Sequence, residues 1–155
     1  MRAGLTAFIL TIATSATGGI EHTVLHGVSV AAVRVWTGPG TVPGLTKEQL
    51  QSAAETSLRE AGIRLTPGAP AELQISATVM VSDSACFATL DAKLVEEARL
   101  ERNGLRVDAS SWGRGGVVSV NVETCAERVT DATKSAVADF VEMYRAMNPP
   151  PSKNR

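Results

Sequence analysis

The stretch that decides the fold runs from Cys86 to Trp112 and reads CFATLDAKLVEEARLERNGLRVDASSW. Asn103-Gly104, near its end, is the strongest short signal for a β-hairpin, because the tight turn needs positive φ at both central residues. Apolar residues alternate with polar ones on both sides of this dipeptide, as in strands with one buried face. The stretch therefore predicts two antiparallel strands joined at Asn103-Gly104.

Charge and hydrophobicity favour the same register for this hairpin. Placing Arg102 opposite Leu105 aligns opposite charges on one face and apolar residues on the other. The resulting pairs are Glu101 with Arg106, Arg99 with Asp108, Leu100 with Val107, and Ala98 with Ala109. A slip of one residue would move every apolar side chain to the wrong face.

Both hairpin strands are expected to extend well beyond the turn. The first continues backward with apolar residues at Ala88, Leu90, Ala92 and Leu94. The second is expected to be interrupted by a bulge within the glycine run 113–116 and to resume over 117–122. A bulge there would change the register, which is compatible with a contact between the two cysteines but does not require one.

One strand is predicted before the first helix and one strand after it. Residues 26–36 are rich in Val and predict a strand, whose alternation slips at Ala31-Ala32. The slip fits either a bulge or a strand buried on both faces. Residues 72–82 alternate cleanly and predict a half-buried strand.

Two helices carry recognisable end signals. Thr46 and Gln49 form a capping box, and Gly62 ends the helix predicted over 46–61. Thr124 and Glu127 have the same spacing, which predicts a second capping box and a helix that ends at Asn148, before three prolines.

The order β-α-β-β-β-α predicts an α+β fold in one domain, residues 26–148. We expect a four-stranded, mostly antiparallel sheet with two helices packed on one face. Residues 149–155 are rich in proline, and we expect a mobile tail there.

The first residues resemble a cleavable export signal, residues 1–18. Arg2 is followed by an apolar run, LTAFILTIA, and then by small residues that allow cleavage after Ala16 or Gly18. A membrane anchor is the alternative, but a spanning helix needs about 20 apolar residues. We expect an exported protein, periplasmic or secreted, with no membrane anchor in its mature form.

The chain has two cysteines, Cys86 and Cys125. In an exported protein a disulfide between them is the simplest expectation. Two buried thiols, or a reactive Cys125 near a helix N-terminus, are the alternatives.

Composition and motifs favour a protein without catalytic machinery. The chain carries 15 basic and 16 acidic residues, so no electrostatic footprint for nucleic acid is expected. His22 and His26 have no third ligand at a recognisable spacing, so we expect no metal site. No nucleophile with a matching base and no cofactor motif is found, so no catalytic residue and no cofactor is predicted. Trp112 and Arg114 are candidates for an interaction surface, although a core tryptophan is an equally good interpretation.

Three segments carry a resemblance to known proteins: LTKEQLQSAAETSLREAGIRL (45–65), ASSW (109–112) and FVEMYRAMNP (140–149). Together with the order of elements, they resemble uncharacterised bacterial exported proteins. That architecture is similar to the amino-terminal domain of TolB and to small periplasmic lipoproteins of envelope assembly, although the lipid-attachment cysteine is missing here. The resemblance implies a periplasmic, non-enzymatic domain that binds an envelope or extracellular protein. The alternative function is a small ligand-, metal- or thiol-active exported protein.

Overall fold

A computed structural model describes residues 25–38 and 42–149 of the chain. The expected export signal, His22 and most of the proline-rich tail lie outside these residues. The elements are β1 (Val30–Thr37), α1 (Lys47–Glu60), β2 (Ala71–Ser82), β3 (Ala85–Arg99), β4 (Arg106–Asn121), a 3-10 turn (Val122–Thr124) and α2 (Cys125–Met147). The predicted α+β class and the order β-α-β-β-β-α are confirmed.

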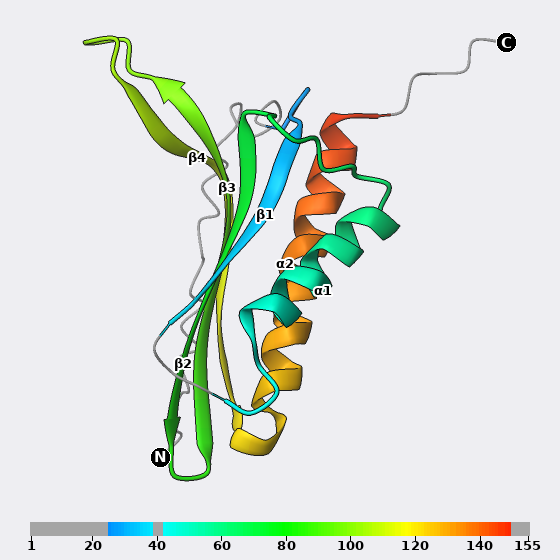
Figure 1. Cartoon of the computed structure of the whole chain (residues 1–155), viewed down its shortest axis with the longest axis vertical. Coiled ribbons are helices and arrows are strands. Elements are labelled where there is room, and N and C mark those ends of the chain that lie inside the picture. Colours follow the sequence, from blue (N-terminus) through cyan, green and yellow to red (C-terminus); the bar gives the residue numbers. More distant parts are fainter. Residues whose placement is uncertain (1–24, 39–41, 150–155) are drawn as a thin grey trace, which may run out of the picture.

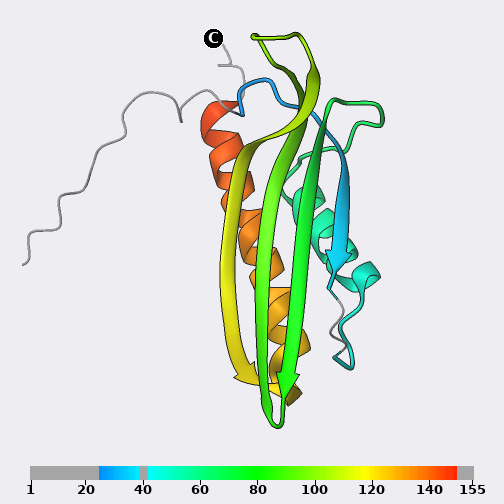
Figure 2. The same cartoon turned by 90° about the vertical axis from the view of Figure 1, so that its left-hand side faces the viewer.

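The four strands form one sheet in the order β1-β2-β3-β4 (Figure 2). β1 runs parallel to β2, and the other neighbours are antiparallel. The β1–β2 register shifts between Val30 and Ala32, so of the two alternatives for the Ala31-Ala32 slip the structure has the bulge. As a result, Val30, Val33 and Val35 are all buried.

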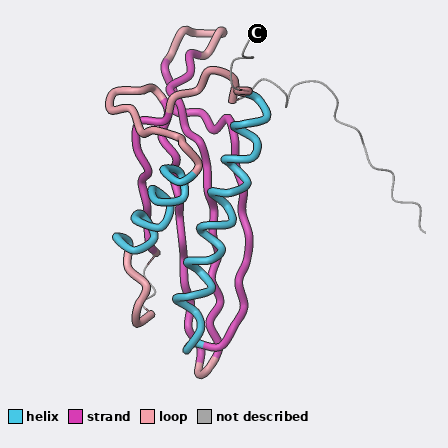
Figure 3. The backbone as a smooth tube through the Cα atoms, turned by 90° about the vertical axis from the view of Figure 1, so that its right-hand side faces the viewer, coloured by secondary structure: helices cyan, strands magenta, loops and turns pink. Residues whose placement is uncertain are grey.

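Both helices cover the same face of this sheet (Figures 1 and 3). The core lies between the two layers, and Phe140 of α2 is among its largest fully buried side chains. The Phe140 ring meets Trp112 of β4 edge-on, with centroids 5.2 Å apart, and Tyr144 at 6.0 Å. In the part of the chain that the structure describes, no helix is long and apolar enough to cross a membrane.

The predicted ends of α1 are confirmed. The Thr46 hydroxyl accepts a hydrogen bond from the Gln49 amide at 3.1 Å, and the Gln49 side chain accepts one from the Thr46 amide at 2.9 Å. At the other end Gly62 has a φ of 78°, and the Ile63 amide donates to the Leu58 carbonyl at 2.9 Å. Positive φ here suits glycine, which has no Cβ to clash.

The capping box predicted for α2 is wrong. A 3-10 turn precedes this helix, and Thr124 makes no side-chain cap. Its hydroxyl donates instead to the carbonyl of Asn121 at 3.2 Å. Thr124 has φ and ψ of −100° and 1°, away from the extended conformation that an N-cap usually adopts. The predicted end at Asn148 is confirmed.

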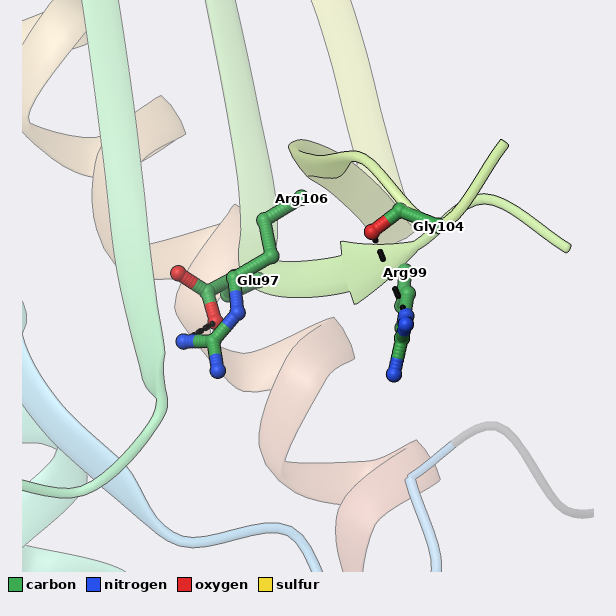
Figure 4. A network of polar contacts seen from close by, with 4 residues as sticks. All are labelled: Glu97, Arg99, Gly104 and Arg106. Atoms are coloured by element: carbon green, nitrogen blue, oxygen red, sulfur yellow. Dashed lines mark hydrogen bonds and ion pairs between the residues drawn. The ribbon is translucent and has the colours of Figure 1, made fainter.

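The predicted hairpin register is also wrong, by two residues. Arg99 lies opposite Arg106, and Ala98 lies opposite Val107. A six-residue connection, 100–105, joins the strands, and of its residues only Gly104 has a positive φ. Figure 4 shows the resulting contacts: Arg106 pairs with Glu97 at 2.9 Å, and Arg99 donates to the Gly104 carbonyl at 3.2 Å.

The interruption of the fourth strand lies at Ser111 and not at the glycines. Leu94 pairs with Trp112 and Val95 with Ser110, so Ser111 is the extra residue of a bulge. The glycine run 113–116 is paired throughout with β3. The bulge brings Cys86 opposite Val120, close to the start of α2.

Candidate interaction surface

No described element covers the face of the sheet opposite the helices, and we call this face the open face (Figure 2). Four large apolar side chains on this face are exposed: Trp36 of β1 (45%), Met80 of β2 (67%), Phe87 of β3 (42%) and Val117 of β4 (75%). An exposed apolar group of this kind on a sheet marks an interaction surface or an aggregation hazard.

Three of the four lie close together near the β2–β3 turn. Met80 is directly opposite Phe87, and Phe87 is opposite Ser119. Val117 is two residues before Ser119 and therefore diagonal to Phe87. The cluster thus spans three adjacent strands. Trp36 pairs with Ser76 of β2 and is not part of this cluster.

The sequence did not indicate these residues. Alternation assigns every second strand residue to the polar side, and Met80, Phe87 and Val117 fall on that side. The signal that could have found them is a large apolar side chain at a position where the alternation expects a polar one.

The two predicted interface residues play different roles in the structure. Trp112 is 8% exposed and packs on Phe140, so it contributes to the core, the alternative interpretation of this residue. Arg114 is exposed, and its Nε donates to the Asp139 carboxylate of α2 at 3.0 Å. Only Arg114 of this pair is accessible to a partner.

A shallow pocket of about 340 Å³ lies beside Gly116, between β4 and α2. Leu90 and Val118 of the sheet and Ala132 and Ala136 of α2 contribute apolar wall, and the ion pair of Arg114 and Asp139 contributes polar groups. A Cβ at Gly116 would meet no atom within 4 Å. The missing side chain therefore leaves the space between strand and helix unfilled. We call this the Gly116 pocket.

The two cysteines form the expected disulfide. Cys86 at the start of β3 and Cys125 at the start of α2 are 39 residues apart in sequence, with their Cα atoms at 6.0 Å. Both residues are fully buried. A thiol-based activity, one of the alternatives, would require this bond to be opened first.

Other candidate chemistry finds little support in the described residues. They contain no group of three or more His, Cys, Asp and Glu side chains placed to hold a metal ion. His26 lies in the loop before β1, while its proposed companion His22 is outside the described residues. Glu96 accepts a hydrogen bond from the Ser111 hydroxyl, and thus serves the bulge of β4.

No protein-family model matches this chain, and no curated protein matches it. Solved structures offer distant likenesses. PelC from Paraburkholderia phytofirmans, solved as a dodecamer, is 17% identical over 76% of this chain and 87% of that chain, with a TM-score of 0.44. The lipoprotein GNA1162 from Neisseria meningitidis is 15% identical over 74% and 98%, with a TM-score of 0.40. A minor lipoprotein from Acinetobacter baumannii is 9% identical over 76% and 93%, with a TM-score of 0.30. The resemblance to the TolB amino-terminal domain stays a prediction.

Proposed function

We propose that this chain is an exported, non-enzymatic module that binds another protein of the bacterial envelope or the extracellular space through the open face of its sheet. The observation that carries this proposal is the exposed cluster of Met80, Phe87 and Val117. Burying such side chains against a partner removes apolar area from water, which contributes a favourable free energy of about 25 cal/mol per Å².

Two features support the location. The first residues have the layout of an export signal. The Cys86–Cys125 disulfide is of the kind that persists in oxidising compartments. Together they favour the periplasm or the extracellular medium.

Site-specific photo-crosslinking in the source cells tests the proposal. A photoreactive amino acid replaces Phe87 on the open face in one strain and Glu142, an exposed residue of α2, in a control strain. We expect a discrete crosslinked product from position 87 that is absent from position 142. Fractionation of the same cells locates the protein.

A second variant shows whether the contact has functional weight. Phe87→Glu places a charge in the centre of the cluster and should abolish the crosslink formed from a reporter at position 80. Equal crosslinking from positions 87 and 142, or no product from either, would argue against protein binding through the open face.

A further inference from the structure

In the part of the chain that the structure describes, no element covers the outer edge of β4 along the glycine run. β4 is the last strand of the sheet, and all five residues from Gly113 to Val117 are exposed. Edge strands are usually protected by charges, prolines or bulges. From Gly113 to Asn121 this edge has no proline and one charged residue, Arg114, and that residue is paired with α2.

The backbone of this edge offers a regular set of groups that no described strand pairs. The Val122 amide donates to the Ser84 carbonyl at 2.9 Å, which fixes which residues of β4 bond to β3. In an antiparallel pair these residues alternate, so the residues that bond to β3 include Gly116 and Val118. The N–H and C=O groups of Gly113, Gly115 and Val117 then point outward from the free edge of β4, in the plane of the sheet. Only another extended backbone matches such an array group for group.

The Gly116 pocket lies at the same place on the helix side of the sheet. A residue of an added strand opposite Gly116 would direct its side chain to that side, because directly opposite residues share a face. It would enter the space next to Leu90 and Ala136 that no described side chain fills. The pocket walls are mostly apolar, which favours a branched aliphatic side chain.

We propose that the outer edge of β4 binds an extended segment of a partner protein as a fifth strand, with a branched aliphatic side chain seated in the Gly116 pocket. Main-chain hydrogen bonds to Gly115 and Val117 give affinity, and the pocket selects the side chain. This inference rests on the proposed protein-binding function but assigns it a second surface, the backbone edge of β4, which shares only Val117 with the exposed cluster of Met80, Phe87 and Val117.

A second copy of this chain fits the edge less well than a foreign segment. Its own β4 would present Trp112, Arg114, Gly116, Val118 and Val120 to the helix side. Trp112 is buried, Arg114 is paired with Asp139, and Val118 and Val120 pack against the core of their own chain, so none of these side chains is free to fill the pocket.

Selection from a displayed library of random linear peptides on the disulfide-bonded protein tests this proposal. The selected peptides should share Val, Ile or Leu at one fixed position within a β-prone sequence. Amide hydrogen exchange should show that the Gly115 and Val117 amides exchange rapidly in the free protein and become protected when a selected peptide binds.

Two variants separate the pocket from the edge. Gly116→Leu fills the pocket without a clash at its Cβ and should weaken peptide binding about 30-fold, as for the loss of one interface hot spot. Val117→Pro removes an outward N–H at an edge position where proline is tolerated, and should weaken binding similarly. Val117→Ser loses the same side chain but keeps the N–H, and should bind within about twofold of wild type.

The outcomes are distinct from those for the open face. Phe87→Glu should leave peptide binding unchanged, even if it abolishes the crosslink that tests the proposed function. Failure of the library to yield any binder, or peptide binding unaffected by both Gly116→Leu and Val117→Pro in variants that keep the wild-type circular dichroism spectrum, would overturn the proposal. So would a dimer in sedimentation that Val117→Pro dissociates, because a second copy would then be the occupant of the edge.

Discussion

At the scale of single residues, the Cys86–Cys125 disulfide ties β3 to α2. We expect the double variant Cys86→Ala/Cys125→Ala to lose about 3–4 kcal/mol of unfolding free energy, because the bond closes a loop of 39 residues in the unfolded chain. Urea denaturation followed by circular dichroism measures this loss. Wild-type protein unfolded in a reducing agent is the control and should show the same reduced stability. Identical stability with and without the bond would contradict the expectation.

Gly38 is a second residue whose role can be measured. Its amide donates to the Ala77 carbonyl at 2.8 Å, and a Cβ at this position would lie 2.8 Å from Oγ1 and 3.1 Å from Cβ of Thr78. Rotation of the Thr78 side chain does not move its Cβ, so Gly38→Ala should cost about 1–3 kcal/mol of unfolding free energy.

The companion variant for Gly38 is Thr78→Ala, which removes the two nearest atoms. In the double variant part of the lost stability should return, a non-additivity expected of residues in contact. Strictly additive costs in thermal or urea unfolding would show that the two positions do not meet.

At the scale of elements, the two helix starts provide a matched pair. Thr46 caps α1 through its hydroxyl, whereas the Thr124 hydroxyl bonds to the Asn121 carbonyl before α2. Thr46→Ala should therefore cost about 1 kcal/mol of unfolding free energy, and Thr124→Ala less than about 0.5 kcal/mol, as for ordinary surface substitutions. Urea unfolding of the two variants makes the comparison. Equal costs would mean that Thr124 acts as a cap in solution.

The elements also show where sequence reasoning works and where it stops. The ends of α1 were predicted because caps depend on residues only a few positions apart, such as Thr46 and Gln49. The hairpin register was not, because a shift of two residues keeps every side chain on its face. The exposed ion pairs that favoured the predicted register contribute only about 0–1 kcal/mol each, too little to exclude the other register. In the register that the structure has, Arg106 pairs with Glu97 and not with Glu101.

The same limit explains the misplaced bulge and the missed surface. Glycines have no side chain whose alternation could reveal a slip, so the run 113–116 could not show that it stays in register and that the extra residue is Ser111. Alternation does place Phe87 on the polar side of its strand. It does not say whether that side faces water or a partner, because both positions lie outside the core of the isolated chain.

At the scale of the whole molecule, the described residues form two layers, in which the helices cover one face of the sheet and no described element covers the other (Figures 1 and 2). Phe140 lies in the covered layer and is fully buried, while Phe87 lies on the open face. The same substitution, Phe to Ala, therefore compares what a side chain on each face contributes to the free energy of unfolding. Phe140→Ala should cost about 3–5 kcal/mol of unfolding free energy through the cavity it leaves, and Phe87→Ala should stay within about 0.5 kcal/mol of wild type.

Urea unfolding at two protein concentrations makes this comparison decisive. If the open face is free in the isolated protein, the midpoint of each variant is independent of concentration, because no association is linked to folding. A large cost for Phe87→Ala together with a concentration-dependent midpoint would contradict the expectation and would mean that a second copy covers the open face. A small cost, combined with loss of the crosslink in Phe87→Glu, would assign this side chain to binding and not to stability.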